Sequence, residues 1–227
     1  ILVFDATGLA GHNAPTGDTR WRFPWGDNSD ERVNVCQPAI IHGSTGKGRQ
    51  AVPANQLLIS SGYGRGSALI SVTRNSVDKW TVKEVWRANT LKSKFSSVVV
   101  HGGHAFGLDD GILTCISLAD GTRRWKQGRY GHGQLIIVND MLLVQAEFGR
   151  IVLVKADSEA FREVAGLDAL SERTWNHPVV AGRHLLVRND REAVCYLLPV
   201  LTPSSTQPLP EPHSIATPGK QGQDHSQ

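Results

Sequence analysis

The sequence predicts an all-β fold: a β-propeller made of four-stranded antiparallel blades. Three observations predict it. Short apolar runs alternate with turns, glycine accounts for 23 of the 227 residues, and the chain repeats itself internally with a period of about 40 residues. Glycine-rich turns between short apolar runs favour strands over long helices.

The repeat is clearest around tryptophan. The stretch LADGTRRWK at 118–126 parallels APTGDTRWR at 14–22, and in both a glycine stands four residues before the tryptophan. Trp86, in VKEVWR, lies in a third such strand. A single four-stranded sheet exposes two apolar faces, so it is stable only where neighbouring sheets cover both. We therefore expect the tryptophans to pack between blades.

Four segments mark the first strand of successive blades, each with a polar pair, a short apolar run and a turn: CQPAIIHG, SSVVVHGG, GHGQLIIVND and NHPVVAGR. The predicted order is the end of one blade (1–23), three complete blades (34–87, 95–126 and 132–166) and three strands of a last blade (175–198). About four to five blades are thus present, and we expect them to be the C-terminal part of a larger propeller of about seven or eight blades.

Two segments fall outside this pattern. Residues 1–200 form the predicted propeller, whereas residues 201–227 are rich in Pro, Ser, Gln and Gly and predict a disordered tail. The segment STGKGRQAVPAN at 44–55 predicts an exposed loop, because its GKG lacks the Ser or Thr that completes a phosphate-binding loop.

Charge and apolar patterning exclude several classes of protein. The net charge is only +3, which gives no electrostatic reason to expect nucleic-acid binding. No run of 18 apolar residues occurs, so we expect no transmembrane segment. Cys36, Cys115 and Cys195 are too far apart for zinc-ligand spacing, and we expect buried strand thiols and no metal site. The sequence opens on Ile1 inside an apolar run, so we expect any signal segment to lie outside it.

The strings GLAGHNAPTGDTRWRF, LDDGILTCISLADGTRRWK and LVRNDREAVCYL resemble the repeats of the PQQ-like β-propeller proteins. That superfamily contains quinoprotein alcohol dehydrogenases and the outer-membrane assembly factor BamB. The usual Leu-Asp of the repeat is replaced by His12 and Asn13 in the first string. The resemblance implies the propeller fold and a periplasmic or otherwise exported location, but it leaves the activity open because the superfamily includes both enzymes and scaffolds.

A propeller brings the start of each first strand and each turn between second and third strands to one face. The residues predicted on this face, at the mouth of the central channel, are Gln37, Ser97, His132 and His177 before the first strands, and Arg65, Asp109 and Asn189 at the turns. We predict that they bind a small polar ligand or a protein partner. The alternative is structural: hydrogen bonds to channel water and to neighbouring strand ends.

The sequence and the family resemblance are compatible with two functions. The first is a non-catalytic scaffold that binds a partner through its loop face; a ligand-sensing propeller attached to a larger exported protein is not separable from it. The second is a dehydrogenase with PQQ and calcium over the channel, which needs oxygen ligands and, in the family's alcohol dehydrogenases, commonly a ring of adjacent cysteines. This sequence has no adjacent cysteines, and Asp109-Asp110 fits a turn. We expect the scaffold, without a cofactor.

Overall fold

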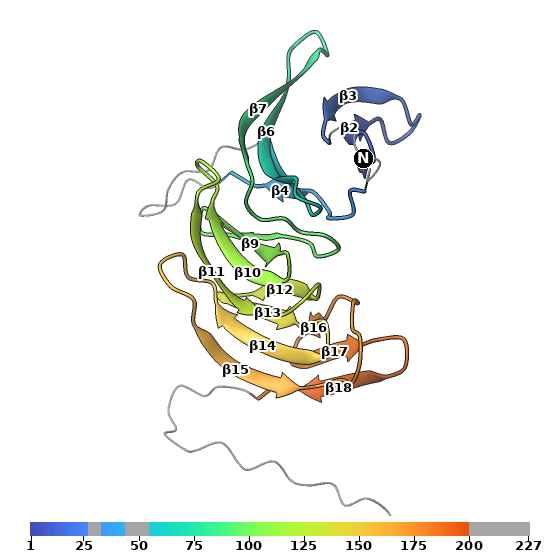
Figure 1. The fold of residues 1–227 in the computed structure, drawn as a ribbon. Coiled ribbons are helices and arrows are strands. Elements are labelled where there is room, and N and C mark those ends of the chain that lie inside the picture. The colour runs from blue at the N-terminus through green and yellow to red at the C-terminus, as the bar shows by residue number, and fades with distance from the viewer. Residues whose placement is uncertain (27–32, 44–54, 200–227) are drawn as a thin grey trace, which may run out of the picture.

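The computed structural model describes residues 1–26, 33–43 and 55–199 of the chain. In these residues it contains strands and turns without helices, arranged as five antiparallel sheets that follow one another in a curved row (Figure 1). Within the same residues nothing forms a helix able to cross a membrane. The predicted tail at 201–227 and nearly all of the predicted loop at 44–55 lie outside the described residues.

Each sheet is one propeller blade, and we name the strands of a complete blade A to D. The first blade holds β1 (Leu2–Asp5), β2 (Gly8–His12) and β3 (Thr19–Pro24), which are strands B to D. The second holds β4 (Ala39–Ile41), β5 (Gln56–Ser61), β6 (Gly66–Arg74) and β7 (Trp80–Ala88). The third holds β8 (Val99–His101), β9 (His104–Asp109), β10 (Ile112–Ser117) and β11 (Arg123–Arg129). The fourth holds β12 (Gln134–Val138), β13 (Met141–Gln145), β14 (Arg150–Lys155) and β15 (Glu163–Asp168). The fifth holds β16 (Val179–Ala181), β17 (His184–Arg188) and β18 (Ala193–Leu197), which are strands A to C.

These sheets confirm the predicted fold class and blade order, with boundaries that differ from the prediction by a few residues. The same backbone hydrogen bond recurs within each of the last four blades. It joins the end of strand C to the A–B turn at distances of 2.7–3.0 Å, from Val72 to Asn55, Leu118 to Gly103, Ala156 to Asp140 and Leu198 to Arg183. Equivalent positions in different blades can therefore be compared directly.

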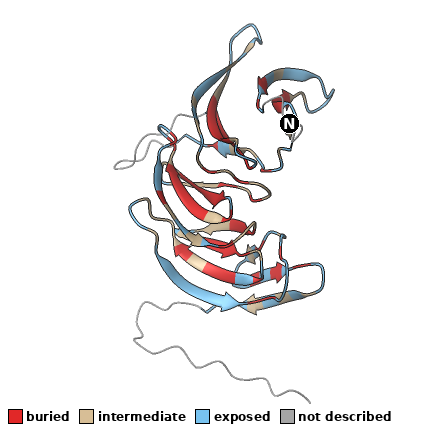
Figure 2. Cartoon of the chain, in the orientation of Figure 1, coloured by how far each residue is buried: buried red, intermediate tan, exposed pale blue. Residues whose placement is uncertain are grey.

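The core consists of apolar side chains between successive blades. One cluster joins blades three and four, where Phe106 and Leu113 face Leu142 and Val152. Similar clusters join the other neighbouring pairs. Figure 2 shows the middle strands largely buried and the outer strand β15 exposed along its length. Each blade is thus stabilised mainly by its neighbours, as in other repeat architectures.

The strand-D tryptophans pack between blades, as predicted. The Nε1–H group of Trp86 donates to the carbonyl oxygen of Leu118 at 2.8 Å, and that of Trp125 donates to the carbonyl oxygen of Asp157, also at 2.8 Å. Both acceptors lie in the C–D turn of the next blade. The Trp125 ring is only 8% exposed and contacts Phe161 of that next blade, with ring centroids 5.7 Å apart. Each tryptophan therefore adds a hydrogen bond to the apolar contact between two blades.

The prediction for the cysteines is partly wrong. Cys36 and Cys115 are buried, and burial raises the pKa of both thiols to about 12. Only Cys115 of these two lies in a strand, because Cys36 stands before β4. Cys195, in β18, is exposed. It lies on the side of the fifth blade that faces away from the fourth, where the described residues form no further sheet.

We expect Trp125→Ala to lower the free energy of unfolding by about 3–5 kcal/mol, because it removes a buried ring and an interblade hydrogen bond. Trp125→Phe keeps a ring and loses the donor, so it should cost about 1–2 kcal/mol. Urea unfolding followed by circular dichroism measures both. A cost below about 1 kcal/mol for the alanine variant would show that the tryptophan does not hold the blades together.

Candidate functional site

The seven predicted site residues lie at one end of the blades. Gln37, Ser97, His132 and His177 each stand two residues before strand A of their blade. Arg65 lies in a B–C turn, Asp109 ends strand B, and Asn189 directly follows strand B. We call this end, made of the B–C turns and the segments that lead into strands A, the B–C face. The hydrogen bonds and ion pairs described for these seven side chains and their backbones join them to other residues, not to one another.

Asp109 is held by lysines. Its side chain is 1% exposed, and its carboxylate lies 2.9 Å from Nζ of Lys126 and 3.6 Å from Nζ of Lys92. It also accepts the backbone N–H of Lys92 at 3.1 Å. Burial opposes the charge on Lys92, but Asp110 and Asp109 outweigh this effect and raise the pKa of its ammonium group. The carboxylate is therefore a structural counterion for two cations.

Asn189 stabilises its own turn. Its Oδ1 atom accepts the backbone N–H groups of Arg191 and Glu192, both at 2.9 Å. Its Nδ2 group donates to the carbonyl oxygen of Ser171 at 2.6 Å. The side chain is 6% exposed, so its polar atoms serve the turn and the segment before strand A.

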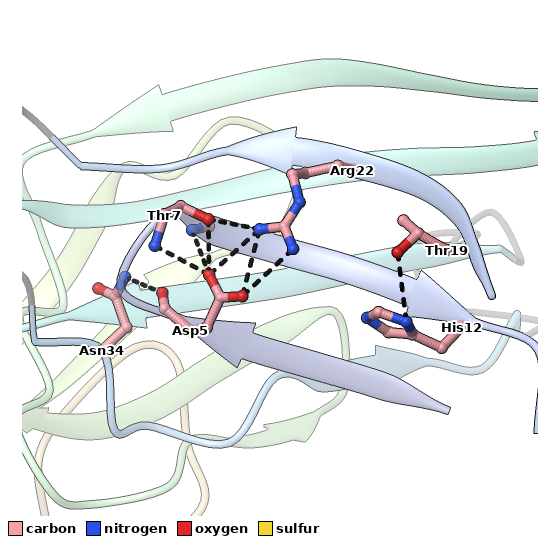
Figure 3. A network of polar contacts seen from close by, with 7 residues as sticks. Asp5, Thr7, His12, Thr19, Arg22 and Asn34 are labelled. Carbon is pink, nitrogen blue, oxygen red and sulfur yellow. Dashed lines mark hydrogen bonds and ion pairs between the residues drawn. The ribbon is translucent and has the colours of Figure 1, made fainter. Parts of the chain in front are cut away.

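Arg65 takes part in a link between the first two blades. Its Nη1 atom donates to Oδ1 of Asn34 at 3.2 Å, and Nδ2 of Asn34 donates to the carbonyl oxygen of Asp5 at 2.8 Å. Asp5 lies at the B–C turn of the first blade, where its carboxylate accepts from Thr7 and pairs with Arg22 at 3.2 Å (Figure 3). Hydrogen bonds from Arg22, and then from Thr7, hold the pKa of the Asp5 carboxyl well below its usual range.

The sequence prediction did not include Asp5. A signal for it exists, because an aspartate followed by Thr7 and Gly8 is typical of a turn in which the carboxylate accepts from the chain beyond it. On the other predicted positions, Gln37 and His177 are exposed, and Ser97 is half-buried. Although His177 is exposed overall, partial desolvation of its ring lowers the pKa of that ring.

His132 lies beside a second interblade link, centred on Glu147 in the B–C turn of the fourth blade. The backbone N–H of His132 donates to Oε2 of Glu147 at 3.0 Å. Nε1–H of Trp175, which leads into the fifth blade, donates to Oε1 at 3.1 Å. Nε of Arg173 lies 4.0 Å from the same oxygen. One carboxylate thus fixes an aromatic side chain on the B–C face.

Two aromatic rings of this face each lie beside a cation. Nζ of Lys94 lies 5.0 Å from the ring centroid of Tyr63, and Cζ of Arg173 lies 4.9 Å from that of Trp175. Phe95 contacts Trp175, with ring centroids 5.6 Å apart. We call these five residues the aromatic band. Tyr63 is 36% exposed and Trp175 is 45% exposed, so the band offers large apolar surface to solvent between positive charges.

The sequence prediction missed Phe95 and Trp175. Both stand four residues before strand A, at the position that Val35 and Tyr130 occupy in the other blades. In the four blades with a described strand A this position holds Val, Phe, Tyr or Trp, and it directly precedes the polar pair. The sequence shows this regularity, but it does not show which of these side chains are exposed. Tyr130 is buried, whereas Trp175 at the same position is exposed.

The described residues do not fit the calcium and PQQ site. Calcium takes six to eight oxygen ligands. Asp109 is neutralised by lysines, Glu147 accepts from His132 and Trp175, and Asn189 serves its turn. Among the residues that the structure describes, no three or more His, Cys, Asp or Glu side chains are grouped to hold a metal ion. The Nδ1 atom of His104 lies 3.0 Å from the carbonyl oxygen of Gly102, in the turn that precedes β9.

The Asp5 network predicts a pH-dependent stability. A carboxyl with a depressed folded-state pKa stabilises the fold above its unfolded value, here 3.8, and loses this contribution as the pH falls below that value. We expect Asp5→Asn to be less stable than the wild type at pH 7 and the difference to shrink steadily below about pH 4. Urea unfolding across a pH series measures this difference. Asp190→Asn, at an exposed turn position, is the control; a pH-independent difference for Asp5→Asn would contradict the assignment.

Comparison with known proteins agrees with this architecture. The crystal structure of BamB from Moraxella catarrhalis is similar, with a TM-score of 0.58 and 14% sequence identity, over 86% of this chain and 52% of that chain. This chain therefore spans about half the length of that protein. The designed protein Ika8 matches with a TM-score of 0.40 and 8% identity, over 79% of this chain and 61% of its own. A search of curated proteins finds no match. The family model described as outer membrane protein assembly factor BamB matches residues 5–195, and the chain belongs to that family.

Proposed function

We propose that the chain is a non-catalytic scaffold that binds a protein partner through the aromatic band on its B–C face. The observation that carries this proposal is the presence of two cation–π pairs in the band, whose Tyr63 and Trp175 rings are exposed. Tryptophan, tyrosine and arginine are the residue types that contribute most to protein–protein interfaces.

The band is held in place before any partner arrives. Nε2 of Gln134 donates to the carbonyl oxygens of both Phe95 and Trp175, at 3.1 and 3.2 Å. The bond from Trp175 to Glu147 fixes the indole ring. Side chains that are ordered in the free protein lose less entropy on binding. The proposal therefore requires no rearrangement of the face.

The family supports a role in protein–protein contact, because its model is named for an outer-membrane assembly factor. By the same likeness we propose that the protein is exported and acts in the periplasm. The proposal contains no cofactor, metal ion or nucleic acid. No observation in the described residues favours the dehydrogenase, because the carboxylates of the B–C face are engaged in ion pairs and turns.

A photo-crosslinking amino acid tests the binding face in cells that make the protein. Phe148, in the B–C turn next to Glu147, is 69% exposed and accepts the substitution without loss of packing. Val77, in a C–D turn at the opposite end of the blades, is 77% exposed and is the matched control. We expect a discrete crosslinked protein from position 148 and none from position 77. Equal crosslinking from both positions, or none from 148, would contradict the proposal.

Trp175→Ala should weaken binding of the crosslinked partner by about 30-fold, as for other exposed aromatic residues at the centre of an interface. Purified partner and variant, compared by calorimetry, give this ratio. Val77→Ala should leave the affinity unchanged. Trp175→Ala also removes the hydrogen bond to Glu147, so the variant should lose about 1 kcal/mol of stability but remain folded, and circular dichroism checks this.

A further inference from the structure

The fourth blade lacks the tryptophan that the two preceding blades carry. Trp86 pairs with Leu69, Trp125 with Cys115, and Ala165 with Leu153 in the C–D ladders. These three strand-C residues are equivalent, because each pairs with the same position of strand B, namely Leu58, Phe106 and Leu143. Ala165 therefore stands where an indole ring fills the space between neighbouring blades elsewhere.

A cavity of about 290 Å³ lies at this position, between the fourth and fifth blades. We call it the indole slot; its lining includes Met141, Leu143, Leu153, Ala165, Gly166 and Leu198. Almost all of the lining is aliphatic. Ala165 and Gly166 are exposed, so the slot is open to solvent, and an aromatic ring that enters it removes aliphatic surface from water.

The polar partner of the missing indole is also present. In the preceding blades the tryptophan donates to a carbonyl of the C–D turn, at Leu118 in the case of Trp86. Leu198 is the equivalent of Leu118 in the fifth blade, because both donate to the A–B turn in the same way. Nε of Arg183 lies 3.0 Å from the Leu198 carbonyl oxygen, and a carbonyl oxygen can accept a second hydrogen bond.

We propose that the indole slot binds a tryptophan side chain of a partner polypeptide. The equivalent sites hold this side chain, delivered there by an extended strand, β7 or β11. The slot lies beside β15, which is the outer strand of its sheet among the described residues, and an extended segment of another chain can pair with the backbone of such an edge. It lies between blades, toward the A–B turns at Asn139, and is separate from the B–C face. The inference therefore goes beyond the proposed function and does not depend on it.

The single methionine of the sequence reports on the slot. Met141 lines it, so a ¹³C-labelled methionine methyl group gives one native signal inside the cavity. We expect N-acetyl-tryptophanamide to shift this signal through the ring current and to saturate at millimolar concentration. N-acetyl-leucinamide, which carries no ring, should produce no comparable shift. Met141→Leu identifies the signal.

Two variants block the slot. Ala165→Trp should fill it, shift the Met141 signal without any ligand and abolish the response to the tryptophan amide. Leu167→Asp places a charge at the slot; Leu167 is 43% exposed, so the fold tolerates the change, and binding should weaken at least tenfold. This second variant decides the question if Ala165→Trp fails to fold.

The absence of any wild-type shift with the tryptophan amide would overturn the proposal. A shift with free indole but none with the amide would also overturn it, because the slot would then exclude a ring attached to a polypeptide. Equal responses in the wild type and Leu167→Asp would place the binding elsewhere and contradict the assignment.

Discussion

The contact between a strand-D tryptophan and the next blade is the interaction on which the rest of the structure depends. A blade buries neither of its faces alone, and neighbouring blades diverge toward their outer strands. A large ring is needed to fill that wider space. Trp86 and Trp125 fill it and also satisfy a turn carbonyl of the following blade. Where Ala165 takes the same position, a cavity remains between the blades.

At the other end of the blades, polar groups make the interblade links. Asn34 joins the first two blades, and Glu147 joins the fourth blade to the segment before the fifth. Among the described residues of the B–C face, Asn34 and Glu147 are therefore engaged in links between blades. The same face carries the aromatic band. Of the polar residues that the sequence predicts at the channel mouth, Arg65, Asp109 and Asn189 make structural contacts within and between blades.

The fold could be predicted from the sequence because each blade repeats a local pattern of turns, strands and tryptophan. Turn residues and the period place all seven predicted site residues at one end of the blades. Their partners were not predictable: Lys92 and Lys126 reach Asp109 from a linker and from strand D, which only the folded blade brings together. The aromatic band also could not be recognised without the folded structure. Phe95, Tyr130 and Trp175 share one position in their blades but differ in burial.

The sequence shows that strand D of the fourth blade has no tryptophan, and that Ala165 takes its place. The cavity that results depends on how the fourth and fifth blades pack. Stability in repeat proteins is close to a sum over interfaces between neighbours. The interface between the fourth and fifth blades, without its ring, should then be the weaker one.

Native-state hydrogen exchange measures this most directly, because it gives an opening free energy for each strand. Our account predicts that amides of β17 open at a lower free energy than those of β13, and that Ala165→Trp raises the protection of β17 while leaving that of β9 unchanged. Equal protection of β17 and β13 in the wild type, or no gain in β17 from the added ring, would contradict the claim that strand-D tryptophans hold the blades together.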